Sequence, residues 1–177
     1  AFWLRNPFIS ECAEPMRQHM ERKTSLPLAL SELAILVAAR HWSATYAWCR
    51  HEPQAIGAGI DPAAVAALRD GQTPDFRDPK AALTYRVPRL LLESGGLDAQ
   101  TYQRVVDLFG LQTAIELVSM IGYGSLVSLS NTTFEPDPPG GALDCLPPGP
   151  GPQSPSGWEP YGRRLDIDAG RDRSNLI

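Results

Sequence analysis

Apolar residues recur along the first 134 residues with the spacing of helices. The stretch LALSELAILVAAR, residues 28–40, is rich in Leu and Ala and apolar nearly all round, which predicts a helix buried on several sides. Strand-like alternation with hairpin turn signals is lacking. The pattern therefore predicts an all-α fold of about five or six helices between residues 10 and 132. The other predicted helices cover residues 44–52, 61–71, 79–94, 98–109 and 111–129.

Local signals mark where two of these helices begin and end. Ser43 is the predicted N-cap of the helix that follows it, and Pro53 is expected to end or kink that helix. Asp61 with Pro62 next to it favours a helix start, and Gly71 favours a helix end.

The last part of the chain differs in composition. Residues 135–177 hold nine of the 17 prolines and seven of the 15 glycines, which is typical of an irregular tail. The charged far end of this stretch has few apolar anchors to offset the entropy of ordering. We therefore expect a helical domain over residues 8–134 and a tail over 135–177 that lies outside the core and is dispensable for the fold.

The charge balance and the cysteine content limit the partners, the metal sites and the cellular location that can be expected. Because 16 basic residues stand against 20 acidic ones, a nucleic-acid partner is not expected. Cys12, Cys49 and Cys145 are too scattered for a disulfide framework or a CxxC pair, which predicts reduced thiols, no metal site and a cytoplasmic location. The first residues lack the plan of a signal peptide and no 18-residue apolar run is expected to span a membrane.

Three histidines are the first candidates for proton transfer, because their side chains titrate near neutral pH. His19 lies in a charged stretch and is most simply a solvated helix residue, while His41 suits the carbonyl end of an apolar helix. His51 differs, because its i−4 and i−7 neighbours are Ala47 and Ala44, whose small side chains leave room for a ligand. A partly buried histidine with both nitrogens hydrogen-bonded is the alternative interpretation.

Two glutamates on apolar helix faces are further candidates. Glu32 stands among Leu, Ile and Ala, so its carboxylate must find a partner or take up a proton unless it serves as a first-turn capping residue. Glu116, Ser119 and Tyr123 form a narrow polar stripe in an otherwise apolar helix. Such a stripe either lines a pocket or joins subunits.

The stretches LPLALSELAILVAARHWSATYAWCRHEPQAIGAGIDPAAVAAL and ELVSMIGYGSLVSLSNTTFE carry a family resemblance. They resemble the carboxymuconolactone decarboxylase and alkyl hydroperoxidase D superfamily, over residues 8–135. The family motif is a Glu, a CxxC pair that begins twelve residues later, and a His four residues after the second Cys. Glu32 and His51 match this motif, whereas Ala44 and Ala47 stand at the cysteine positions.

The resemblance is nearer to the decarboxylase branch, which lacks the cysteine pair and commonly has Tyr-Glu-Trp before the His. Tyr46 and Trp48 match, and Ala47 stands in place of the central Glu. The resemblance implies a cofactor-independent lyase or isomerase of small carboxylated lactones or related oxygenated acids. It also implies an alkyl hydroperoxidase D-like helical bundle that assembles into dimers, trimers or hexamers, which would explain why the helix at 28–40 is apolar all round.

In this interpretation His51 moves a proton and Glu32 orients its imidazole, and the two helices fold back side by side so that both groups meet in one pocket. A catalytically lapsed binding or assembly module, whose Pro-rich tail docks a partner, is the main alternative, and peroxidase-type activity is a weaker one. The expected substrate-binding residues are Tyr46, Trp48, Arg40 or Arg50, Glu116 and Tyr123.

Overall fold

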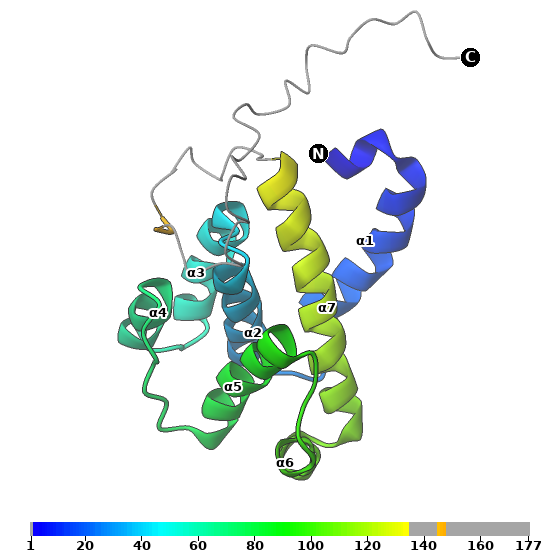
Figure 1. The fold of residues 1–177 in the computed structure, drawn as a ribbon. Helices are drawn as coiled ribbons and strands as arrows, with labels where there is room; N and C mark the ends of the chain where they lie inside the picture. Colours follow the sequence, from blue (N-terminus) through cyan, green and yellow to red (C-terminus); the bar gives the residue numbers. More distant parts are fainter. Residues whose placement is uncertain (1, 135–144, 148–177) are drawn as a thin grey trace, which may run out of the picture.

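The computed structural model describes residues 2–134 and 145–147, and all regular elements in these residues are helical. The all-α prediction is therefore confirmed. Figure 1 shows the helices gathered around α2, with α3 and α4 on one side and α7 on the other. The elements are η1 (Phe2–Arg5), α1 (Pro7–Arg22), α2 (Leu28–His41), α3 (Thr45–Gly57), α4 (Pro62–Arg69), α5 (Pro79–Ser94), α6 (Ala99–Phe109) and α7 (Leu111–Phe134).

Helix α1 contains His19, which was expected on a helix, but the bounds of this helix were not predicted from the sequence. Asn6 caps its start, accepting the backbone N–H of Ile9, and Pro7 occupies its first turn. Only Ala13 and Met20 are buried along its 16 residues. Apolar residues do recur with helical spacing in this stretch, so the sequence contained a signal for α1 that the prediction left out. These residues are Phe8, Ile9, Cys12, Ala13, Met16 and Met20.

Helix α2 is the centre of the core. It packs against α3, α5 and α7, and Leu33, Ala34, Leu36 and Ala39 are completely buried. Its apolar surface is thus covered on several sides by helices of its own chain. Subunit contacts are not needed to explain why this helix is apolar all round, contrary to the expectation from the sequence.

The turn between α2 and α3 corrects one predicted boundary. Ser43 adopts a left-handed conformation with φ 51°, and its N–H donates to the Arg40 carbonyl. The Ala44 N–H donates to the Ala39 carbonyl, which completes a Schellman motif. Ser43 therefore ends α2 instead of capping α3, which starts at Thr45. The tight turn brings α3 back alongside α2.

Helix α3 also continues beyond the predicted end. It runs through Pro53 to Gly57, so the proline lies inside the helix instead of ending it. Packing of the buried Ala55 and of α3 against α2 and α7 compensates for the hydrogen bond that proline cannot donate.

A short piece of the Pro- and Gly-rich tail is part of the core. Leu146 is buried among the core residues, and the Pro147 carbonyl accepts a hydrogen bond from Nη1 of Arg40 at 3.1 Å. Cys145 forms a disulfide with Cys49 of α3. The expectation that the tail lies outside the core is therefore wrong for residues 145–147, since one leucine and one disulfide suffice to anchor them. Residues 135–144 and 148–177 lie outside the described part of the chain.

The disulfide also corrects the prediction of unpaired cysteines. The Cα atoms of Cys49 and Cys145 are 5.8 Å apart although 96 residues separate them in sequence, and spacing along the chain gives no sign of such a contact. Cys12 is free and exposed. The cysteines therefore no longer support a cytoplasmic location.

Helix α7 is long and apolar enough to cross a membrane by length and composition alone, contrary to the expectation that no such segment is present. Core helices pass the same test. Helix α7 contacts α2, α3 and α6, and its one charged residue, Glu116, is buried against the connection between α1 and α2. In this structure α7 is an element of the bundle.

Candidate functional site

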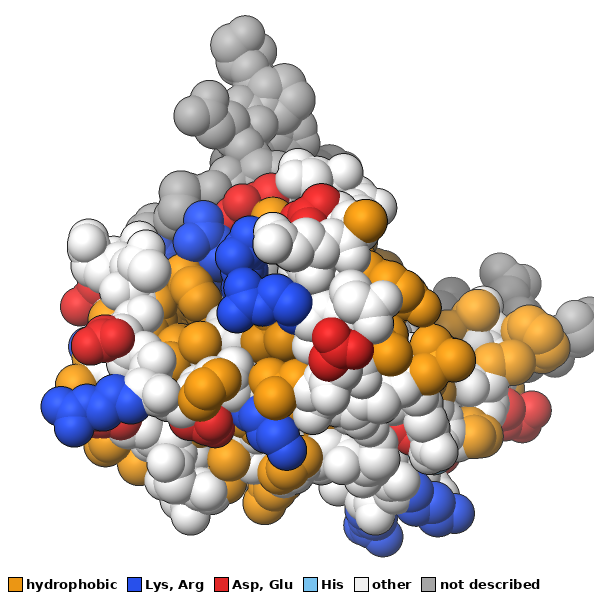
Figure 2. Space-filling view, turned by 90° about the horizontal axis from the view of Figure 1, so that it is seen from below, with side chains coloured by type: hydrophobic (Ala, Val, Ile, Leu, Met, Phe, Trp, Pro, Cys, Tyr) orange, Lys and Arg blue, Asp and Glu red, His pale blue; other side chains and the backbone are white. Residues whose placement is uncertain are grey.

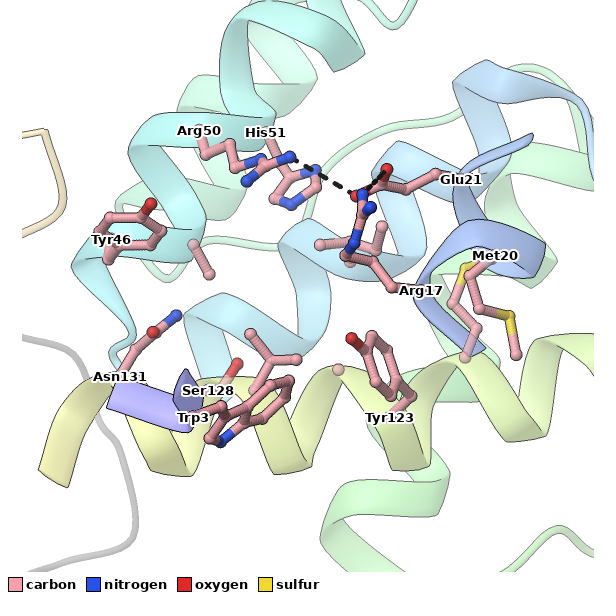
Figure 3. Close-up of a pocket in the computed structure, with 15 residues that line it drawn as sticks. Trp3, Arg17, Met20, Glu21, Tyr46, Arg50, His51, Tyr123, Ser128 and Asn131 are labelled. Carbon is pink, nitrogen blue, oxygen red and sulfur yellow. Dashed lines mark hydrogen bonds and ion pairs between the residues drawn. The ribbon is translucent and has the colours of Figure 1, made fainter. Parts of the chain in front are cut away.

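A pocket of about 280 Å³ lies between α1, α3 and α7, and one wall is formed by Ile35 of α2. Figure 3 shows the polar side chains of α1 and α3 facing the side chains of α7 across it. Most of the wall is apolar, with a small number of polar groups, as in ligand-binding pockets generally. The lining residues are Trp3, Arg17, Met20, Glu21, Ile35, Tyr46, Ala47, Arg50, His51, Met120, Tyr123, Gly124, Val127, Ser128 and Asn131.

The predicted meeting of Glu32 and His51 is confirmed. Nδ1 of His51 lies 2.7 Å from Oε2 of Glu32, and the two side chains are 15% and 7% exposed. The Schellman turn makes this possible, because it places the first turns of α3 beside α2. His51 lines the pocket while Glu32 lies behind it. Nε2 of His51 has no hydrogen-bond partner among the described residues, so it is the nitrogen available to a ligand.

Charged side chains at one end of the pocket are linked by consecutive ion pairs that were not predicted from the sequence. Arg17 forms ion pairs with Glu14 and Glu21, and Nη2 of Arg50 lies 3.5 Å from Oε1 of Glu21 (Figure 3). Hydrogen bonds from Arg17 and Gln18 lower the pKa of Glu14 to about 2. Arg50, one of the two arginines considered as carboxylate ligands, thus lies at the pocket with Arg17 beside it.

Of the aromatic candidates, Tyr46 and Tyr123 line the pocket and Trp48 does not. Burial raises the pKa of Tyr123, so its hydroxyl is protonated at neutral pH. Trp3 closes the same side, with its ring centroid 6.4 Å from that of Tyr123 and its Nε1 donating to Ser130 Oγ. Trp48 is fully buried in the core, where its Nε1 has no partner among the described residues. It acts as a core residue.

Arg40 is not at the pocket, contrary to the prediction. Arg40 is buried near Gly71, and its Nη1 donates a hydrogen bond to the Pro147 carbonyl. Burial lowers the pKa of Arg40, partly offset by the charge of Asp70. A helix that is apolar all round gives no indication of which side faces a cavity, and for this reason the sequence could not separate Arg40 from Arg50.

Glu116 is likewise outside the pocket. Its Oε2 accepts hydrogen bonds from Thr24 Oγ1 and from the N–H and Oγ of Ser25, at 2.7–2.8 Å, and Oε1 accepts one from Gln112. Burial acts to raise the pKa of Glu116, but these hydrogen bonds outweigh it and lower the pKa to about 2. Glu116 thus fastens the connection between α1 and α2 to α7.

The remaining histidines have structural positions. His19 of α1 lies 3.5 Å from Glu116, and His41 stacks edge-on against Trp42 at the end of α2. Burial lowers the pKa of His41. Neither lines the pocket, which leaves His51 as the pocket histidine among the described residues.

Ser128 and Asn131 were not predicted as site residues. Both are buried on α7 and line the pocket. The spacing from Tyr123 to Asn131 is eight residues, or two helical steps of i+4, so the polar stripe that begins at Glu116 could have been followed to this position.

Comparison with known proteins adds no relative: no family model, no curated protein and no solved structure matches the chain. In the described part of the chain, no group of three or more His, Cys, Asp and Glu side chains is placed to hold a metal ion. The site is a mostly apolar pocket that holds a carboxylate-paired histidine, a neutral tyrosine, and two arginines that share the carboxylate of Glu21. Such a set can bind a small acid and move a proton.

Proposed function

We propose that this chain is a cofactor-independent lyase or isomerase of small carboxylated lactones or related oxygenated acids. The observation that carries the proposal is the contact between Glu32 and His51, with the free nitrogen of the imidazole at a pocket. A histidine held by a buried carboxylate has one tautomer and one orientation, which a general acid-base catalyst needs.

In the proposed reaction Glu32 accepts the Nδ1–H of His51, and Nε2 exchanges a proton with the substrate carbon. The negative charge of Glu32 stabilises the imidazolium that forms when Nε2 takes up a proton. The substrate carboxylate binds near Arg50, whose side chain is 45% exposed and whose contact with Glu21 is long at 3.5 Å. Tyr46 and Tyr123 shape the space between.

The resemblance to the carboxymuconolactone decarboxylase superfamily supports this choice of chemistry. The motif spacing predicts that Glu32 and His51 meet, and they do. Ala47 lines the pocket together with His51, and Ala44 is buried at the start of α3, so one of the two positions of the family's cysteine pair lies at the pocket. We propose that the chain shares the fold of that superfamily.

Self-association is part of the proposal, with the exposed face of α7 as the contact surface in place of α2. This face carries five exposed large apolar residues and no charged residue. The surface at the α5 and α6 end of the molecule contrasts with it, because apolar side chains there are mixed with basic and acidic ones (Figure 2). The five apolar residues of the α7 face are Leu111, Ile115, Val118, Leu126 and Leu129. Sedimentation equilibrium at micromolar concentration tests whether subunits associate.

The test of the proposed function is turnover of candidate carboxylated lactones by the purified protein and its His51→Ala variant. Loss of general acid-base help should lower turnover by about a hundredfold or more without changing the helical content. His41→Ala is the matched control, because His41 lies outside the pocket, and it should keep native turnover. Native turnover in His51→Ala would refute the role of His51, and absence of turnover in the native protein would favour the lapsed binding module.

The disulfide favours a second candidate, thiol-dependent peroxide reduction. In that reaction one thiolate attacks the peroxide to give a sulfenic acid and an alcohol or water, and the second thiol displaces water to form the disulfide, which a thiol reductant then reduces. Cys49 and Cys145 form such a pair, although neither lines the pocket of His51. Peroxide consumption in the presence of dithiothreitol, compared with the Cys49→Ser variant, tests this candidate.

A further inference from the structure

Asn131 is a buried polar residue whose side-chain donor has no partner in the described part of the chain. It is 6% exposed and lines the pocket from the last turns of α7, and its Nδ2 has no hydrogen-bond partner among the described residues. Figure 3 shows its amide directed away from α7 into the space below Tyr46. Neither Tyr46 nor Ser128, the polar pocket residues nearest to it in this view, is hydrogen-bonded to it.

Buried side-chain donors are nearly always paired, and an unpaired one destabilises the fold. In the described part of the chain, Arg40, Trp48 and Thr84 also have an unpartnered buried polar atom, but none of these three lines the pocket. Asn131 is thus the unpartnered donor that a ligand in the pocket can reach. Retaining an unpaired donor where an apolar residue would pack is expected when the donor serves a ligand.

We propose that Asn131 determines ligand specificity by donating a hydrogen bond from Nδ2 to a carbonyl or hydroxyl oxygen of the bound molecule. This inference rests on the proposed function for the chemistry at His51 and adds the recognition of the other end of the substrate. The substrate class it names is an acid with an apolar middle and a second, uncharged oxygen remote from the carboxylate.

The length of this molecule follows from helix geometry. Tyr46, which Figure 3 shows above the Asn131 amide, and His51 are five residues apart on α3, which corresponds to about 7.5 Å along the helix axis. Ala47 of α3 and Val127 of α7 are apolar lining residues of this part of the pocket. A ligand about as long as an extended dipeptide therefore reaches from the Asn131 amide to the imidazole.

The experiment measures binding of a matched pair of probes, 6-oxoheptanoate and heptanoate, which differ by one ketone oxygen. By calorimetry, the native protein should bind the oxo acid about tenfold more tightly than heptanoate. In 15N-labelled protein the side-chain amide signal of Asn131, assigned by its loss in Asn131→Asp, should shift with the oxo acid and stay in place with heptanoate.

Two variants separate recognition from a structural role. Asn131→Leu should remove the preference for the oxo acid and raise the melting temperature, because an unpaired donor is replaced by an apolar group. Asn131→Asp keeps the size of the side chain but removes the donor, so it should also lose the preference. Thr84→Val is the control: it removes an unpartnered buried oxygen outside the pocket and should leave the affinities of both probes unchanged.

The proposal is overturned if the native protein binds neither probe, if it binds both equally, or if the Asn131 variants keep the preference for the oxo acid. Its failure is distinguishable from failure of the proposed function through His51→Ala. That variant should bind 6-oxoheptanoate with native preference even though it has lost turnover. Native turnover in His51→Ala combined with loss of the preference in Asn131→Leu would leave the recognition role standing and remove the catalytic one.

Discussion

The region around Glu32 and the region around Glu116 each hold a carboxylate buried on a largely apolar helix, yet the two are satisfied differently. Glu116 accepts hydrogen bonds from Thr24, Ser25 and Gln112, which fix both of its oxygens. Glu32 has one hydrogen bond among the described residues, to His51, which lines a pocket. A carboxylate with all of its hydrogen bonds made inside the protein, such as Glu116, holds helices and loops together. A carboxylate paired with a titratable side chain at a cavity, such as Glu32, can take part in proton transfer.

The largest expected effect is a difference in the free energy of unfolding between variants that lack one or the other carboxylate. Glu116→Ala leaves the Ser25 N–H and two hydroxyl groups without their acceptor and should lower the free energy of unfolding by about 3–4 kcal/mol. Glu32→Ala removes one hydrogen bond, and His51 can turn to water in the pocket, so the loss should be about 1 kcal/mol. Urea unfolding of both variants measures the difference, and equal losses would contradict the comparison.

A second test concerns the side of α3 that faces away from the pocket. Cys49→Ser removes the disulfide to Cys145 and should destabilise the fold by about 3 kcal/mol. Because neither cysteine lines the pocket, turnover at His51 should stay at the native level at temperatures where the variant is folded. Thermal unfolding followed by circular dichroism, together with the turnover assay, checks both parts. Loss of turnover in the folded variant would move the chemistry to the thiols.

The smallest effect is in the dependence of stability on pH. The pKa of Glu116 is lowered from 4.5 to about 2 in the folded state, so its contribution is fully present above pH 4.5 and is lost as the pH falls towards 2. The native protein should lose about 2 kcal/mol more than Glu116→Gln over this range. Urea unfolding at pH 6 and pH 3 measures it, and parallel losses in the two proteins would show that Glu116 titrates normally.

Sequence reasoning predicted six of the seven α-helices in the described residues, and it predicted the contact of Glu32 with His51. Both depend on short-range spacing. Glu32 and His51 are 19 positions apart on consecutive helices, and the tight turn at Ser43 folds the second helix back on the first. The same reasoning did not delimit α1, and it left open whether the helix of His51 continues past Pro53, as α3 does.

What the sequence by itself determined is therefore the all-helical class and the local pairing of an acid with a histidine. The tertiary structure decided which sides of the apolar helices face the pocket, and so it excluded Arg40, Trp48 and Glu116 and brought in Asn131. It also joined Cys49 to a cysteine 96 residues away. The physical reason is that helical periodicity acts within one element, whereas the face a helix turns towards a cavity depends on every helix packed against it.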